Sequence, residues 1–130
     1  MGILLIKTDQ TDAFVGLAED LEVTASLEWL AGNQLSLTLN AKIEKLLKEN
    51  NLEFKDISGI VFFAGPGSFT GLRIGASVAN TLAYSLKVPI VGVSGKDWQD
   101  KGLASIKKGV NDRIAKIHYG NEPNITKPRK

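Results

Sequence analysis

Cysteine is absent from this chain of 130 residues, and histidine occurs only once, as His118. The lack of cysteine excludes disulfides, thiolate nucleophiles and cysteine metal sites, and it agrees with a reducing, cytoplasmic location. The apolar run ahead of Lys7 is too short for a signal peptide or a membrane span. Neither sign of charge predominates, because 16 basic and 14 acidic residues give a net charge of +2, which is too small to indicate nucleic-acid binding by itself.

The composition that is present, with 43% hydrophobic residues, suffices for one ordinary domain with a core of its own. Apolar residues alternate in the early segments and recur at helical spacing in residues 34–50. We expect strands at residues 3–7, 13–18, 22–30, 57–64 and 89–93, and helices at 34–50, at 70–86 and after Ser94. The predicted fold is α/β, with a mixed five-stranded sheet and the element order βββαβαβα.

The most informative segment follows the apolar residues 60–64. It reads Gly65-Pro66-Gly67-Ser68-Phe69-Thr70-Gly71-Leu72-Arg73-Ile74-Gly75. Glycine and proline after a buried strand, followed by hydroxyl residues that cap helices, predict a strand, a tight loop and a helix N-terminus. Because a helix N-terminus attracts anions, this loop is a candidate phosphate site as well as a plain capped turn. The loop residues that would face a phosphate are Gly65, Gly67, Ser68 and Thr70.

The known phosphate motifs do not match this loop. A Walker A loop requires Lys and Ser or Thr where Leu72 and Arg73 follow Gly71, and the dinucleotide fingerprint requires a third glycine where Thr70 stands. The capped turn is therefore the interpretation that the residues favour.

All eleven letters of the segment resemble the signature of the TsaB (YeaZ) family, a partner subunit in bacterial synthesis of tRNA threonylcarbamoyladenosine. Residues 3–6 resemble the first strand of that family, residues 88–94 the strand after its signature helix, and residues 119–128 its C-terminal tail. The resemblance implies a ribonuclease H-like lobe of the type found in actin and Hsp70 ATPases. The element order predicted above agrees with this fold.

Family members carry a second lobe, for which this chain has little room. About thirty residues follow Trp98, too few for another lobe. We therefore expect a shortened family member, in which residues 1–106 form the ribonuclease H-like lobe. Residues 107–130 would be a short remnant with a strand-like segment at 114–119 and the family-type tail.

The sequence lacks the acidic residue that ATPases of this superfamily use to bind a nucleotide with its metal ion. ATPases of this superfamily place an acidic residue after the first strand, and here that position is Lys7, which cannot ligate a cation. Asp9 and Asp12 are expected to be solvated turn residues, and Lys7 a solvated residue at a strand end. No cofactor and no metal site is predicted. A small nucleotide-binding ATPase or kinase-like half-site remains an alternative, favoured by the lobe type and the glycine loop.

No catalytic residue is predicted either. A single histidine, His118, cannot provide the paired histidines that hold the metal in the partner family TsaD. The serines lack a histidine base in any recognisable arrangement. Leu35 stands where TsaB relatives usually have a histidine, so a role for that side chain is not carried over.

The helix predicted at 70–86 has two rows of residues that suggest a binding surface. Gly71, Gly75, Ala79 and Ala83 are four residues apart, and a bulkier row consists of Ile74, Val78 and Leu82. We expect the bulky row to pack on the sheet and the small row to admit a helix of another chain, although helix 34–50 is an alternative occupant. The predicted partner interface is Leu39, Ile43, Gly71, Leu72, Gly75, Ala76, Ala79 and Ala83.

The resemblance implies a function for this surface. TsaB joins TsaD, or itself, through a bundle of these two helices, so we expect a noncatalytic scaffold that binds a TsaD-like transferase as a heterodimer. A homodimer and a larger complex with a TsaE-like ATPase are further options, with tRNA contacted indirectly and no membrane involved. A direct tRNA-binding module is a third hypothesis, based on basic residues at Lys101, Lys107, Lys108, Lys127, Arg129 and Lys130.

Overall fold

The computed structural model describes residues 2–118 of the chain. Its strands are β1 (Gly2–Lys7), β2 (Asp12–Glu19), β3 (Glu22–Leu30), β4 (Ile57–Phe63) and β5 (Ile90–Val93). Its helices are α1 (Leu35–Glu49), α2 (Phe69–Leu86) and α3 (Trp98–Lys107), with short 3-10 turns at Gly32–Gln34 and Phe54–Asp56. The predicted order βββαβαβα is therefore confirmed.

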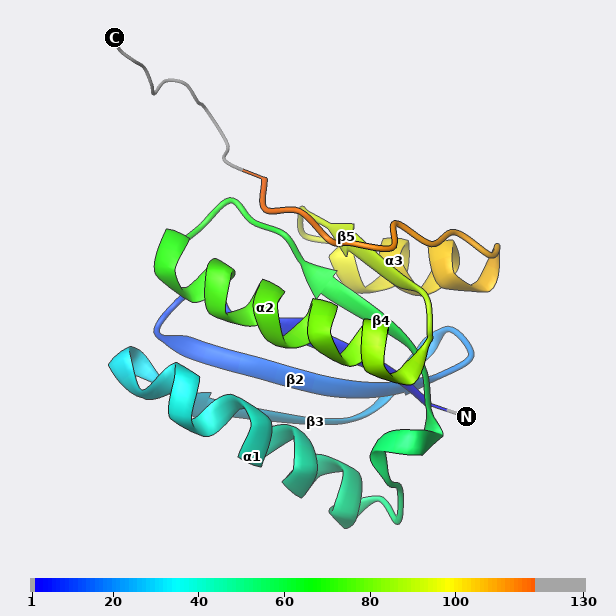
Figure 1. Ribbon diagram of the computed structural model, residues 1–130, viewed down its shortest axis with the longest axis horizontal. Helices are drawn as coiled ribbons and strands as arrows, with labels where there is room; N and C mark the ends of the chain where they lie inside the picture. The colour runs from blue at the N-terminus through cyan, green and yellow to red at the C-terminus, as the bar shows by residue number, and fades with distance from the viewer. Residues whose placement is uncertain (1, 119–130) are drawn as a thin grey trace, which may run out of the picture.

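The five strands form one mixed sheet in the order β3-β2-β1-β4-β5 (Figure 1). β2 pairs antiparallel with β1 and β3, while β4 pairs in parallel with β1 and β5. The predicted α/β class and the mixed five-stranded sheet are confirmed. The parallel strands are joined by the crossovers that contain α1 and α2, as parallel pairing requires.

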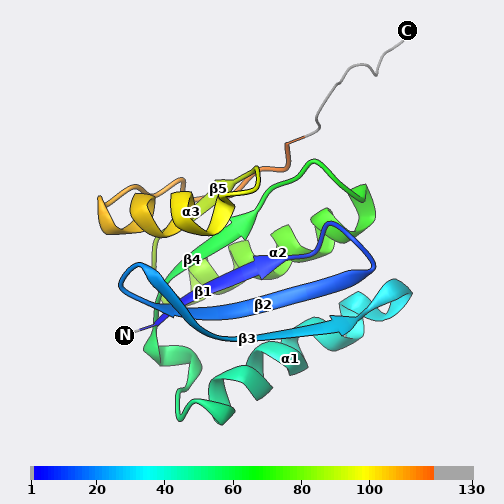
Figure 2. The same ribbon diagram turned by 180° about the vertical axis from the view of Figure 1, so that it is seen from behind.

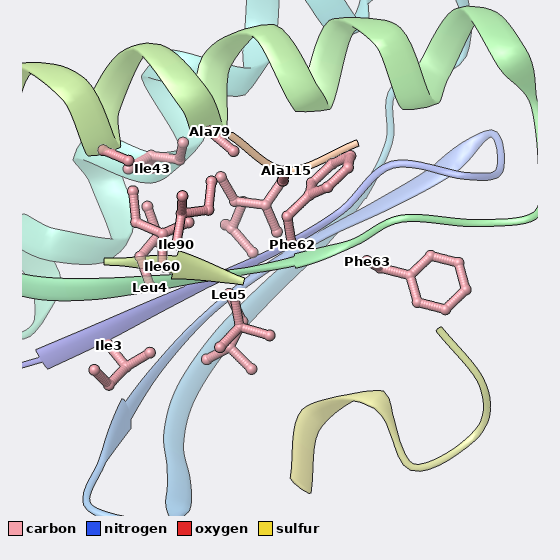
Figure 3. Packing of buried hydrophobic residues seen from close by; sticks show 14 of the residues in the cluster. Ile3, Leu4, Leu5, Ile43, Ile60, Phe62, Phe63, Ala79, Ile90 and Ala115 are labelled. Carbon is pink, nitrogen blue, oxygen red and sulfur yellow. The ribbon is translucent and has the colours of Figure 1, made fainter. Parts of the chain in front are cut away.

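Helices cover both faces of the sheet. α1 and α2 lie on one face (Figure 1), and α3 lies on the other, where Figure 2 shows β2 and β3 without a covering helix. Alternate strand residues supply the two cores: Leu4, Ile60 and Phe62 point to the side of α2, while Ile3, Leu5 and Phe63 point to the opposite side (Figure 3).

An aromatic cluster fixes α3 on its face of the sheet. Trp98, at the start of α3, packs edge-to-face with Phe63 at 5.7 Å and with Phe14 at 5.9 Å between ring centroids. Gly102, one turn later, has no room for a side chain because Val61 of β4 fills the space. α3 is therefore held close to β4 by a large ring at one turn and a glycine at the next.

Residues 111–118 run beside β5 without forming a strand. Asp112 N–H donates to Ile90 O at 2.8 Å, Gly92 N–H donates to the Asp112 carboxylate at 2.8 Å, and His118 N–H donates to Ala64 O at 2.7 Å. Part of the bonding comes from a side chain, so no regular ladder forms, and the strand predicted at 114–119 is wrong for residues 114–118. Tyr119 and the predicted tail lie outside the described residues.

The segment after α3 is nevertheless part of the lobe. Asn80 of α2 accepts from Ala115 N–H at 2.8 Å and donates to Ala115 O at 3.1 Å. The domain boundary proposed at residue 107 coincides with the last residue of α3, and the following residues up to 118 pack back onto β5 and α2.

Candidate functional site

The glycine loop holds α2 tightly against the end of β1. Thr8 is fully buried, and its hydroxyl donates to Gly71 O at 2.8 Å. A Cβ on Gly71 would collide with the Thr8 backbone, and a Cβ on Gly75 would collide with the Thr8 side chain and meet Phe62 at 3.0 Å. Two glycines of the signature therefore give the first turns of α2 room to contact residue 8.

Ser68 begins α2, as the sequence predicts. Its hydroxyl accepts from Gly71 N–H at 3.3 Å, and its own N–H donates to Asp9 O at 2.8 Å. Gly65 has a φ of +105°, a conformation that favours glycine, and Gly67 lies so close to Asp9 that a Cβ would collide with it. The loop is thus a capped turn packed on the segment that follows β1.

Lys7 and Asp9 form an ion pair beside this turn. Lys7 Nζ lies 2.6 Å from Asp9 Oδ1 and 4.7 Å from the centroid of the Phe63 ring. The side chain of Asp9 is only 6% exposed and that of Lys7 is 28% exposed. The prediction that Asp9 is solvated is therefore wrong, because the glycine loop packs over it, and Lys7 is paired rather than simply solvated.

The geometry gives little support to a phosphate site at Gly65, Gly67, Ser68 and Thr70. The amides of Ser68 and Gly71 are already bonded to Asp9 O and to the Ser68 hydroxyl. The backbone and Cβ of Asp9 also lie directly against Gly67 and occupy the space beside the loop. Thr70 is exposed at the edge of the loop.

The predicted partner interface belongs to the core of the chain itself. Seven of its residues are buried, namely Leu39, Ile43, Leu72, Gly75, Ala76, Ala79 and Ala83, and Gly71 is half-buried against Thr8. The prediction that the small row of α2 admits another chain is wrong. The strands present large side chains such as Phe62 and Leu4 to α2, so the helix contributes small residues to that contact (Figure 3).

The opposite side of α2 is the one that remains accessible. Ile74, Val78 and Leu82, expected on the sheet, are only half-buried. The exposed positions of α2 hold four small hydroxyl residues, Thr70, Ser77, Thr81 and Ser85, together with Phe69, Arg73 and Tyr84. α2 carries one charged residue among 18, Arg73, whose guanidinium lies 5.3 Å from the Phe69 ring centroid.

α1 extends this uncharged surface. Its first half, residues 35–41, has no charged side chain, and Leu37 is 74% exposed. Between Phe69, Arg73, Ile74 and Ser77 the surface is hollowed by about 410 Å³. We call the set Leu37, Phe69, Ile74, Ser77 and Val78 the outer helical face. A surface helix with a single charge over about five turns is typical of a face that contacts another protein.

One contact was not foreseen from the sequence. Ser94 Oγ lies 2.6 Å from Nδ1 of His118, although the two residues are 24 positions apart. The pair lies in an open hollow of about 480 Å³ with Lys101, Ser105 and Lys108. Within residues 2–118 no carboxylate bonds to the imidazole ring, so the described contacts do not complete a catalytic triad.

Residues 2–118 contain no cluster of three His, Cys, Asp or Glu side chains arranged to hold a metal ion. None of the helices in this range is both long and apolar enough to cross a membrane.

Comparison with known proteins identifies relatives of this chain. Residues 29–98 match the family model described as TsaD, tRNA N6-adenosine threonylcarbamoyltransferase. The tRNA threonylcarbamoyladenosine biosynthesis protein TsaB of Bacillus subtilis is 39% identical over 95 residues, which are 72% of this chain and 41% of that protein. TsaB of Buchnera aphidicola from Schizaphis graminum is 36% identical over 84 residues, 60% of this chain and 40% of that protein.

A solved structure supports the same relationship. YeaZ from Pseudomonas aeruginosa superimposes with a TM-score of 0.65 and 28% sequence identity, over 72% of this chain and 42% of that one. The chain thus spans about two fifths of the length of these relatives. The expected resemblance is confirmed in both sequence and fold. The chain therefore belongs to the protein family that the TsaD model describes, and the relatives named above are TsaB (YeaZ) proteins.

Proposed function

We propose that this chain is a noncatalytic partner subunit that binds a TsaD-like transferase and so supports threonylcarbamoylation of the tRNA adenosine next to the anticodon. The observation that carries the proposal is the outer helical face, formed by α2 and the first half of α1, which has Arg73 as its one charged side chain. The names of the relatives, which describe threonylcarbamoyladenosine biosynthesis, support the choice of reaction.

The outer helical face suits another helical surface. Leu37 and Phe69 project from it, and half-buried Ile74 and Val78 lie beside the small hydroxyl residue Ser77. Small residues allow close approach of helices, and projecting apolar residues supply the area that stabilises a complex. A TsaD-like protein is therefore the proposed occupant, with a second copy of this chain as the competing outcome. A TsaE-like ATPase would join as a further subunit.

The noncatalytic role rests on the residues near the glycine loop. Lys7, the last residue of β1, occupies the position where ATPases of this fold need an acidic residue, and its ammonium is paired with Asp9. The loop amides of Ser68 and Gly71 are bonded within the chain. The ATPase half-site and the kinase-like half-site are thus less well supported than the scaffold.

The test is co-expression of this chain with the TsaD homologue of the same genome, followed by size-exclusion chromatography with mass measurement. The proposal expects a stable one-to-one complex, and neither ATP hydrolysis nor threonylcarbamoyladenosine formation by the chain alone. Persistent separation of the two proteins would contradict it. Steady-state ATP turnover by this chain that is lost on Asp9→Asn substitution would contradict the noncatalytic role.

A further inference from the structure

An open hollow of about 580 Å³ lies at the C-terminal end of α2, outside the outer helical face. It is lined by half-buried Val88 and Pro89, which lead into β5, and by exposed Tyr84, Lys87 and Arg113. No acidic residue lines it among the described residues. The neighbouring Asp112 carboxylate is directed elsewhere, since it accepts from Gly92 N–H at 2.8 Å. The hollow therefore combines apolar surface with two positive charges.

The two cations stand where the backbone favours glycine. Lys87 ends α2 with a φ of +58°, and Arg113 has a φ of +69° in the turn after α3. Side chains are disfavoured in this left-handed region, and glycine is the usual residue at such a helix end. A lysine at a helix C-terminus is favoured by the helix dipole, but Arg113 is not at a helix end, so the dipole does not explain it.

The same rim carries an exposed aromatic ring. Tyr84 is 87% exposed, the highest value among the exposed large hydrophobic side chains of residues 2–118. Neither Lys87 nor Arg113 has an ion-pair partner within the described range. An accessible ring in the same hollow as two cations without an ion-pair partner suits a nucleotide, whose base can stack on the ring and whose phosphates can bind the cations.

We propose that this hollow, named here the Tyr84 hollow for Tyr84, Lys87 and Arg113, binds single-stranded RNA. An unpaired base stacks on the Tyr84 ring, and Lys87 and Arg113 contact the flanking phosphates. The hollow is open, so it fits a strand that passes across it rather than an enclosed free nucleotide. The choice of RNA rests on the proposed function, whose substrate is a tRNA, whereas the stacking and charge chemistry rests on the structure alone.

The test measures binding of a fluorescently labelled oligouridine to the full chain by anisotropy at low salt. Tyr84→Ala should weaken binding by about tenfold, the usual effect of losing one stacked base, while Tyr84→Phe should bind like the parent. Lys87→Gly and Arg113→Gly remove charge at positions where glycine relaxes the backbone, so both variants should stay folded. Each should weaken binding and lower the salt dependence by about one phosphate contact.

Lys45→Ala, an exposed lysine on α1, is the charge-matched control and should leave RNA affinity unchanged. Equal affinity of the parent, Tyr84→Ala and the double variant Lys87→Gly/Arg113→Gly would overturn the proposal, as would a preference for duplex RNA. All variants should still form the complex with the TsaD homologue. If they do so without any RNA effect, this inference alone fails; loss of the complex in the parent chain would instead contradict the proposed function.

Discussion

The two faces of α2 differ in side-chain size and in their exposure to solvent. The inner face, with Gly75, Ala79 and Ala83, is buried against the bulky residues of β1 and β4. The outer face, with Ile74, Ser77 and Thr81, is accessible and almost uncharged. The small residues of α2 therefore lie where the helix packs on large side chains, which here belong to the sheet of the same chain. The outer face is left for a partner.

The largest effect should come from enlarging the inner face. Gly75→Leu places a side chain where Thr8 and Phe62 already lie, and neither can move without disturbing β1 and β4. We expect a loss of about 3 kcal/mol or more in the free energy of unfolding, or a melting temperature lower by about 10 °C. Thermal melts by circular dichroism provide the measurement.

The matched variant on the outer face is Thr81→Leu, which changes an exposed residue of the same helix. Its stability should stay within about 0.5 kcal/mol of the parent. If Gly75→Leu melted together with the parent, the small row would not be core packing, and the assignment of the two faces would be reversed.

A charge in the middle of the outer face should separate binding from folding. Ser77→Arg introduces a long cation at an exposed position next to Ile74 and Val78. Because a buried unpaired charge is costly at an interface, affinity for the TsaD homologue should fall by at least about tenfold, or 1.4 kcal/mol, with an unchanged melting curve. Titration by calorimetry measures the change. Unaltered affinity would place the interface elsewhere.

The ion pair at the end of β1 should have a moderate effect on stability alone. Lys7→Met removes the partner of the nearly buried Asp9 carboxylate, whose side chain is 6% exposed. Leaving a buried charge unpaired should cost about 1 to 3 kcal/mol in denaturant unfolding. Adding Asp9→Asn to the same chain should recover most of that loss, whereas a double variant as unstable as Lys7→Met would show that the pair itself is not the cause.

The smallest effect is expected at the helix cap. Ser68→Ala removes the acceptor for Gly71 N–H and should cost about 1 kcal/mol, while Ser68→Asn, which keeps an acceptor, should cost little. Chemical denaturation distinguishes the two variants. Equal stability of Ser68→Ala and the parent would mean that the 3.3 Å contact does not stabilise the start of α2.

The element order was predictable because apolar periodicity and the cap at Ser68 are local signals. The burial of Asp9 was not, since it depends on a loop almost sixty residues later in the chain that packs over it. The contact of Ser94 with His118 is also non-local, and serine and histidine lack a motif at that separation.

The side of α2 that faces the sheet could have been predicted from its hydroxyl residues instead of from the size of its side chains. Two rows at the same helical spacing cannot be told apart by size, because a small residue suits either a crowded sheet or a second helix. The hydroxyl residues Thr70, Ser77 and Thr81 recur on one side of the helix, and their polarity marks the side that faces water or a partner. The glycines at 71 and 75 lie nearer the opposite side, where Thr8 and Phe62 leave no room for side chains.

Binding of the partner to the outer face of α2 should protect that face from chemical labelling. The chain has no cysteine, so Ser77→Cys introduces a unique thiol on the outer face, and Ser26→Cys introduces one on β3 at the opposite face of the sheet. Maleimide labelling of each is timed with and without the TsaD homologue. We expect the complex to slow labelling at residue 77 by at least about tenfold and to leave residue 26 unaffected. Labelling of residue 77 at the same rate in the complex as in the free chain would contradict it.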